Sequence, residues 1–232
     1  MIKTLLWDID GTLLDFCKAE AYGIRKCFEI FNLGECTDEM LERYSKINRK
    51  YWEGLERNEL TKSEVLHDRF VEFFGTEGIN FDRINDFNDE YQIRLGDKVF
   101  FCENGLETVT ALKGNVRQFA VTNGTIVAQK RKLAQSGLDK IFDGIFISDE
   151  IGFEKPSVDF FDAVQKEIGK FTPDEVMIIG DSLTSDIRGG NNAGILWNAN
   201  YCDDGTVTSL LASSVWLNDT VDYNTDTLQT LA

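Results

Sequence analysis

The sequence predicts an α/β fold with a Rossmann-like parallel sheet as its core and an inserted helical cap subdomain. In the second half of the 232-residue chain, short apolar runs alternate with helical patterns. Such alternation is typical of a parallel sheet with right-handed crossovers. One more apolar run stands alone near the N-terminus, and a long charged helical stretch separates it from the others. We therefore expect a core of residues 1–15 and 96–232 and a cap of residues 16–95.

The individual elements follow from apolar periodicity. Leu5–Ile9 is a short apolar run that ends in acids, as in a buried strand with polar groups at its carboxyl end. The proline-free stretch that follows contains helical segments at Ala19–Phe31, Thr37–Glu53 and Thr61–Phe74. The remaining strands are predicted at Gln118–Thr122, Gly144–Ser148, Val176–Gly180 and Ile195–Asn198, separated by helices at Val127–Ser136, Val158–Ile168 and Ser185–Ala193.

Composition excludes several classes of protein. The chain has 24 basic and 40 acidic residues, a formal charge of −16 that repels nucleic acid and anionic membranes. Apolar runs are too short to cross a bilayer or to form a signal-peptide core. The five cysteines are scattered without a C-x-x-C pair, which argues against a disulfide framework or a zinc site. We expect a cytoplasmic protein, and the sequence leaves open whether it is a monomer or a homodimer.

Polar residues follow nearly every predicted strand. Ligands of open parallel sheets bind at the carboxyl ends of the strands, so these residues are the candidates for a functional site. In chain order they are Asp8 and Asp10, then Thr122-Asn123-Gly124, then Lys155-Pro156, then Gly180-Asp181 with Asp186. Because the net negative charge opposes an anionic substrate, a phosphate site here would need a strong local positive charge, such as a metal ion together with a lysine.

Asp8 and Asp10 are spaced so that both can face one site. Residues i and i+2 of an extended segment point to the same side. One carboxylate can attack phosphorus and form an aspartyl-phosphate, while the other transfers protons. In isolation, an Asp-x-Asp pair more often caps a turn or a helix, and the spacing does not say which acid would attack.

The other strand ends supply complementary groups. Thr122-Asn123-Gly124 offers a hydroxyl, an amide and backbone N–H groups to phosphate oxygens, although a plain Asn-Gly turn fits the pattern equally well. Lys155 can balance the charge of a phosphate, with an ordinary surface lysine as the alternative. Asp181 can join Asp8 in holding a hard cation such as Mg²⁺ through oxygen ligands.

The order of these motifs resembles that of the haloacid dehalogenase superfamily, and the insertion after the first motif is similar to that superfamily's helical type 1 cap. The resemblance implies that Asp8 is the nucleophile and that Asp10 is the general acid and base. It implies catalytic roles for Thr122 and Lys155 as well, and Mg²⁺ as the cofactor. The implied phosphate-binding residues are Gly11, Thr12, Asn123 and Gly124, and the implied metal ligands are Asp8, Asp10 through its carbonyl oxygen, Asp181, and Asp186 directly or through water.

The resemblance also suggests a substrate. Dehalogenases of the superfamily lack an acid at the position of Asp10, so phosphate chemistry is favoured. Residues 48–52, 64–70 and 147–152 resemble the bacterial pyrimidine 5′-nucleotidase branch, which implies a small phosphorylated substrate such as UMP, dUMP or dTMP. Cap residues would then recognise the base, although aromatic residues at helical spacing more often form a core. The candidates are Phe16, Asn48, Tyr51 and Trp52.

Three alternatives remain at this stage. A sugar-phosphate phosphatase or a phosphomutase would use the same core and differ in the cap. A phospho-accepting signalling domain would not ordinarily have an acid like Asp10 beside its acceptor. An inactive interaction module is disfavoured because every catalytic motif is present.

Overall fold

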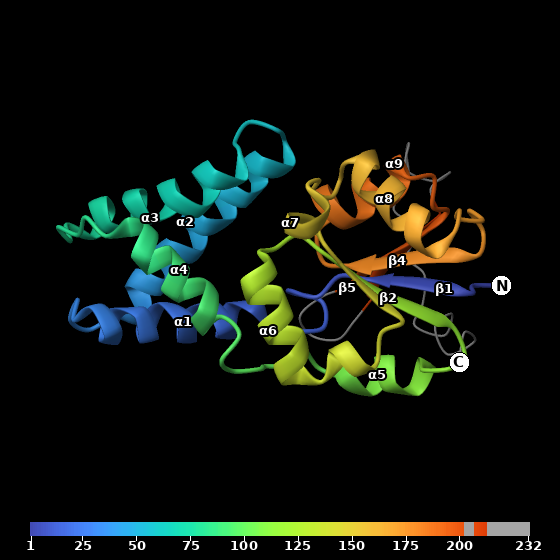
Figure 1. Cartoon of the computed structure of the whole chain (residues 1–232), viewed down its shortest axis with the longest axis horizontal. Helices are drawn as coiled ribbons and strands as arrows, with labels where there is room; N and C mark the ends of the chain where they lie inside the picture. Colours follow the sequence, from blue (N-terminus) through green and yellow to red (C-terminus); the bar gives the residue numbers. More distant parts are fainter. Residues whose placement is uncertain (202–206, 213–232) are drawn as a thin grey trace.

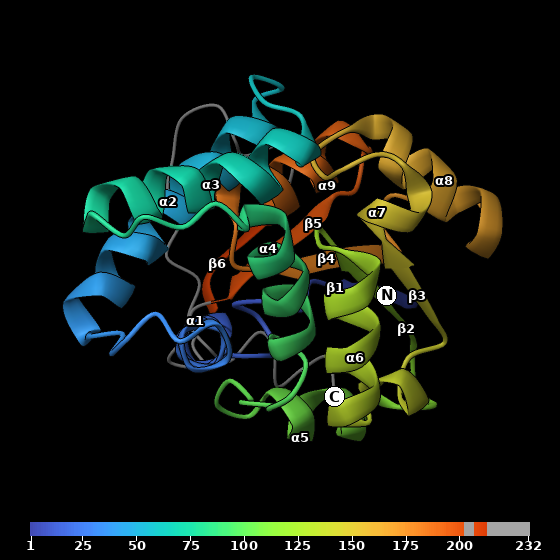
Figure 2. The ribbon, with the colours of Figure 1, turned by 60° about the vertical axis from the view of Figure 1, so that its left-hand side comes forward.

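The computed structural model describes residues 1–201 and 207–212, with side chains over residues 1–196. Its centre is a six-stranded sheet in the order β3-β2-β1-β4-β5-β6 (Figures 1 and 2). The five predicted strands are parallel to one another, and a sixth pairs antiparallel with β5 at the edge. The strands are β1 Thr4–Trp7, β2 Arg117–Thr122, β3 Gly144–Ile147, β4 Val176–Gly180, β5 Trp197–Tyr201 and β6 Val207–Ala212.

The central strand β1 is buried on both faces. Leu5 and Trp7 pack in one apolar cluster with residues of α5 (Gly105–Leu112) and α6 (Ile126–Ser136). Leu6 points the other way and packs with residues of α8 (Val158–Ile168). In Figure 1, α5 and α6 lie on one side of the sheet, and α8 and α9 (Arg188–Asn192) lie on the other. Burial on two faces explains why this strand is a continuous apolar run.

Four helices form a separate layer beside the sheet (Figures 1 and 2). They are α1 Phe16–Phe31, α2 Asp38–Glu56, α3 Lys62–Glu77 and α4 Ile84–Arg94. All fall within residues 16–95, which remain our proposed extent of the cap. A cluster of aromatic rings at their centre comprises Phe28, Tyr44, Phe70, Phe73, Phe74, Phe87 and Tyr91. The rings of Tyr44 and Phe70 stack with centroids 5.3 Å apart, and such pairs add about 0.5–1.5 kcal/mol to the effect of burial.

Side-chain caps fix where the cap helices begin. The Asp15 carboxylate accepts a hydrogen bond from the backbone of Lys18, so α1 starts immediately after the first motif. Thr61 and Glu64 form a reciprocal capping box at the start of α3. The predicted segments Ala19–Phe31 and Thr61–Phe74 overlap these two helices and start within three residues of them.

The fold differs from the sequence prediction at several elements, and helix α4 had not been delimited within the stretch predicted to be helical. Strand β6 and helix α5 were not predicted, because the run Val207–Ala212 lacks a strict apolar–polar alternation and an eight-residue helix leaves a weak periodic signal. Ser148 begins the short helix α7 (Ser148–Ile151) rather than ending β3. The helix predicted over Ser185–Ala193 is a π-helical turn, Leu183–Ile187, followed by α9. The bulge of a π-helix breaks the 3.6-residue repeat on which the prediction depends.

Two further features complete the description. A short 3-10 turn, Leu138–Lys140, follows α6 and leads toward β3. None of the helices in the described ranges combines the length and the apolar character that crossing a membrane requires.

Candidate active site

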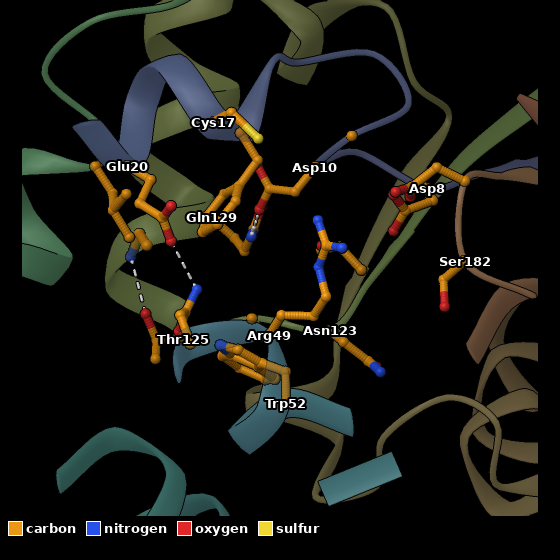
Figure 3. A pocket seen from close by; sticks show the side chains of 18 of the residues that line it. Asp8, Asp10, Cys17, Glu20, Arg49, Trp52, Asn123, Thr125, Gln129 and Ser182 are labelled. Carbon is orange, nitrogen blue, oxygen red and sulfur yellow. Dashed lines mark hydrogen bonds between the residues drawn. The ribbon is translucent and has the colours of Figure 1, made fainter. Parts of the chain in front are cut away.

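A cavity of about 300 Å³ lies where the cap meets the carboxyl ends of the strands (Figure 3). Its core side carries Asp8, Asp10, Thr122 and Asp181, and its cap side carries aromatic and polar residues of α1 to α4. Motifs more than 170 residues apart in the sequence therefore meet in one place. The volume is at the lower end of the range for small-molecule sites, about 300–1,000 Å³.

Asp8 is fixed at the wall of this cavity by two other motif residues. The Lys155 Nζ donates to Asp8 Oδ1 at 2.8 Å, to Asp186 Oδ1 at 2.5 Å and to the Val121 carbonyl at 2.7 Å. The Thr12 hydroxyl lies 3.1 Å from Asp8 Oδ2, to which it donates. Lys155 is completely buried, so its charge acts on Asp8 with little screening by water.

Asp8, Asp181 and Asp186 each place a carboxylate oxygen within 4.8 Å of the others. Burial raises the pKa of Asp8 to about 7, although the charge of Lys155 opposes the rise. Burial and the neighbouring charges of Asp8 and Asp186 raise the pKa of Asp181 to about 8. The ammonium of Lys155 is thus insufficient to balance the three acids. A hard divalent cation with oxygen ligands fits this donor set.

Gly11 allows the first and fourth motifs to approach each other. Its φ of +90° lies in the left-handed region, and a Cβ at this position would lie 2.5 Å from Asp181 Oδ2. The neighbouring Thr12 is fully buried, and its hydroxyl accepts a hydrogen bond from the backbone N–H of Asp181 at 3.1 Å. The Thr12 hydroxyl therefore joins the strand ends of β1 and β4, and the expected contact of Thr12 with phosphate stays a prediction.

Asn123 also connects two motifs. Its Nδ2 donates to the Lys155 carbonyl at 2.7 Å, and its Oδ1 accepts from the Lys155 N–H at 2.8 Å. Both ends of this amide contact the Lys155 backbone, and the expected contact of Asn123 with phosphate stays a prediction. Thr122, Asn123 and Gly124 all line the cavity.

The carboxylate of Asp10 lies apart from the three-acid cluster. It accepts hydrogen bonds from Lys132 Nζ at 2.7 and 2.8 Å. It also accepts one from Gln129 Nε2 at 2.7 Å (Figure 3). The sequence prediction missed both residues of α6. They are three positions apart and so share a helix face, but nothing in the sequence indicates that this face meets Asp10.

The cap side of the cavity includes three of the four expected residues, Phe16, Asn48 and Trp52. Tyr51 is not among the lining residues, and its hydroxyl instead donates to Glu72 at 3.0 Å.

A polar network that the sequence prediction also missed surrounds Asn48. Its Nδ2 donates to Glu20 Oε1 at 2.9 Å, and its Oδ1 accepts from Arg69 Nη1 at 2.9 Å. Glu20 and Arg69 are both buried, and both line the cavity. An isolated buried charge is costly, so the two are accommodated through the shared amide between them.

The chain is similar to known proteins over most of its length. A family model described as haloacid dehalogenase-like hydrolase matches residues 2–194. YfnB of Bacillus subtilis, which carries the general name HAD-hydrolase, is 35% identical over 193 residues, or 83% of this chain and 81% of YfnB. A crystal structure of YfnB bound to magnesium matches with a TM-score of 0.82 over 91% of this chain and 92% of that one, at 32% identity.

Two further relatives have more specific names. The pyrimidine 5′-nucleotidase PynA of Streptococcus pneumoniae is 32% identical over 208 residues, which cover 88% of this chain and 87% of PynA. The pyrimidine 5′-nucleotidase YjjG of Escherichia coli is 27% identical over 191 residues, which cover 82% of each protein. In each case the similarity extends through both the cap helices and the sheet.

Proposed function

Because the chain belongs to the haloacid dehalogenase-like hydrolases, we propose that it is a Mg²⁺-dependent phosphohydrolase with Asp8 as its nucleophile. One observation carries the proposal: Asp8 lies at the cavity wall, bound by a buried lysine and within reach of two more carboxylates. This arrangement has an attacking group, a positive charge beside it and oxygen ligands for a cation. All three promote displacement of an oxygen from a phosphate.

In the proposed reaction, an Asp8 oxygen attacks phosphorus and the bond to the leaving oxygen breaks. The proton of the Asp10 carboxyl passes to that oxygen, giving a free alcohol and an aspartyl-phosphate on Asp8. Water then attacks the phosphorus while Asp10 takes a proton from it. Inorganic phosphate leaves, and the Asp8 carboxylate and the protonated Asp10 are restored. Lys155 orients Asp8 throughout, and the Thr122 hydroxyl at the cavity wall can donate to a phosphate oxygen.

Magnesium fits the acids beside Asp8. We propose that Asp8 and Asp181 hold it, with Asp186 directly or through water and with the Asp10 carbonyl oxygen. A bound Mg²⁺ would supply positive charge to the phosphate oxygens. In this acidic protein, such charge otherwise comes only from lysine and arginine side chains. The magnesium bound in the YfnB crystal structure supports this assignment.

For the substrate, we propose a pyrimidine nucleoside monophosphate such as UMP, dUMP or dTMP. The names of PynA and YjjG support this choice, since both relatives match this chain over more than four-fifths of its length. The aromatic side chains of Phe16 and Trp52 at the cavity wall also support it, because a planar base can stack on them.

The mechanism is tested by Asp8→Asn, measured as release of inorganic phosphate with and without Mg²⁺. Loss of a covalent nucleophile should lower kcat by about 10⁴-fold or more. The matched control is Asp139→Asn, an exposed residue of the turn after α6, which should retain full activity. Undiminished turnover by the Asp8 variant would overturn the mechanism.

The substrate is tested separately with a panel of UMP, dUMP, dTMP, ribose 5-phosphate and hexose phosphates. We expect the highest kcat/KM for the pyrimidine nucleotides. Preference for a hexose phosphate would replace the nucleotidase assignment by a sugar-phosphate phosphatase. Isomerisation of a sugar phosphate without phosphate release would replace it by a phosphomutase.

A further inference from the structure

The Asp10 carboxylate is held on two sides by α6. Lys132 Nζ donates to Oδ1 at 2.7 Å and to Oδ2 at 2.8 Å, and Gln129 Nε2 donates to Oδ2 at 2.7 Å. A carboxylate group has about four lone-pair sites, two on each oxygen. These three bonds occupy both sites on Oδ2 and one on Oδ1. The remaining site on Oδ1 is therefore the one left for exchanging a proton.

Lys132 is an unusual residue to find at this depth. Its side chain is 3% exposed, and its ammonium lies 5.0 Å from the centre of the Phe16 ring. A buried ion pair of this kind is weak evidence for stability, because apolar residues of similar volume often serve as well. Its position on the cavity wall against Asp10 instead suggests a part in the reaction.

The orientation of Gln129 is determined by its partner. A carboxylate accepts hydrogen bonds, so the amide must present Nε2 to Asp10. Gln129 Oε1 is buried and has no hydrogen-bond partner among the described residues. Gly124 leaves room for this arrangement, since a Cβ there would lie 2.4 Å from Gln129 Nε2. The third residue of the Thr122-Asn123-Gly124 motif thus allows Gln129 to reach Asp10.

The site has a separate buried lysine for each of its two central acids. Lys155 contacts Asp8 and Asp186, whereas Lys132 contacts Asp10. The sequence motif included only Lys155. Asp8 is the proposed nucleophile, and Asp10 is the proposed proton donor and acceptor. Because a different lysine binds each acid, Lys132 can orient the Asp10 carboxylate without moving Asp8.

We propose that Lys132 and Gln129 are positioning residues that orient the Asp10 carboxylate and direct its Oδ1 toward the reacting oxygen. The assignment rests on the proposed function, because it concerns the proton transfers of that reaction. Lys132 and Gln129 act through Asp10 and do not touch the reacting atoms.

The test compares Lys132→Met with Lys130→Met on two substrates. Lys130 is on the same helix, is exposed and pairs with Glu150 at 3.0 Å, so its variant controls for loss of a charge from α6. The substrates are UMP, whose alkoxide needs a proton to leave, and 4-nitrophenyl phosphate, whose phenolate does not. The measured quantity is kcat/KM, which reports the steps up to departure of the leaving group.

We expect Lys132→Met to lower kcat/KM for UMP by about 10- to 100-fold, part of the usual effect of general acid catalysis, and to change it little for 4-nitrophenyl phosphate. Gln129→Ala should act in the same direction with a smaller loss. The inhibition constant of inorganic phosphate should stay unchanged in both variants. Lys130→Met should behave as the wild type.

Other outcomes would overturn the assignment. Equal losses on both substrates would indicate a merely structural pair, and a weaker inhibition by phosphate would indicate that Lys132 binds the substrate. A crystal structure of Lys132→Met gives a readout independent of activity, because the Asp10 side chain should leave its present position. An unmoved Asp10 would also overturn the assignment. Failure of the proposed function differs from these, since the wild type would then release phosphate from neither substrate.

Discussion

The two ends of the cavity are built in different ways. At the core end, the functional side chains lie at or just beyond strand ends, and buried lysines bind the acids. At the cap end, a polar network of Glu20, Asn48 and Arg69 lies among helices that pack through aromatic rings. Strand geometry therefore fixes the acids at the core end, whereas side-chain packing between helices fixes the cap end. We expect changes at the core end to affect the reaction and changes at the cap end to affect the choice of substrate.

After Asp8→Asn, the largest expected effect comes from Lys155→Met at the core end. The variant removes hydrogen bonds to Asp8, Asp186 and the Val121 carbonyl. Loss of one such charged donor should lower kcat by about 10²- to 10³-fold on every substrate. Without added Mg²⁺, it should also lower the free energy of unfolding by about 3 kcal/mol, because two buried acids lose their partner.

Steady-state kinetics and urea denaturation would check this prediction. Lys166→Met, at an exposed position of α8, is the control. If Lys155→Met keeps its activity, the core end tolerates the loss of its buried positive charge. The expected difference between the core end and the cap end would then be wrong.

An intermediate effect is expected from Trp52→Ala at the cap end. Stacking of a base on an aromatic ring contributes about 1–3 kcal/mol, so KM for UMP should rise about 10-fold or more. The KM for ribose 5-phosphate, which lacks the base, should be unchanged. The neighbouring Tyr51→Ala is a matched control, because Tyr51 is on the same helix but is not among the cavity-lining residues.

These KM values sharpen the comparison between the two ends. A parallel loss on UMP and ribose 5-phosphate would place Trp52 in the reaction rather than in base recognition. An equal effect of Tyr51→Ala would attribute the loss to a general disturbance of α2.

The smallest expected effect is the pH dependence of stability that Glu20 causes. Burial raises the pKa of Glu20 above its ordinary value of 4.5, although hydrogen bonds from Ser45 and Asn48 and the charge of Arg69 oppose the rise. Between the unfolded and the folded pKa, the folded protein binds more protons than the unfolded one. The Glu20 contribution therefore makes stability fall as pH rises through this window.

Glu20→Gln should remove this contribution, with a change in unfolding free energy of about 1 kcal/mol or less. Urea denaturation between pH 4 and pH 8 gives the unfolding free energy of the wild type and of the variant. Their difference isolates the Glu20 contribution, because the pKa shifts of the acids at the core end are present in both proteins. Glu29→Gln, exposed on the same helix, should leave the profile unchanged. If the unfolding free energy of the wild type relative to Glu20→Gln instead rises with pH, the network stabilises the ionised form of Glu20.

The sequence by itself determined roughly where the five parallel strands lie along the chain and which polar groups stand at their ends. Asp8, Thr122 and Asp181 were identifiable because each follows a short apolar run, and parallel strands present their carboxyl ends at one edge. The relation between a strand and the residue that follows it is local. A sequence can encode it without reference to the rest of the chain.

Only the tertiary structure decided which helix faces meet the site. Trp52 lines the cavity and Tyr51 does not, although they are adjacent and both aromatic. Neighbouring helical residues point about 100° apart, and the rotation of a helix about its axis depends on everything packed against it. For the same reason, the sequence could not show that Lys132 and Gln129 meet Asp10, more than 115 residues away.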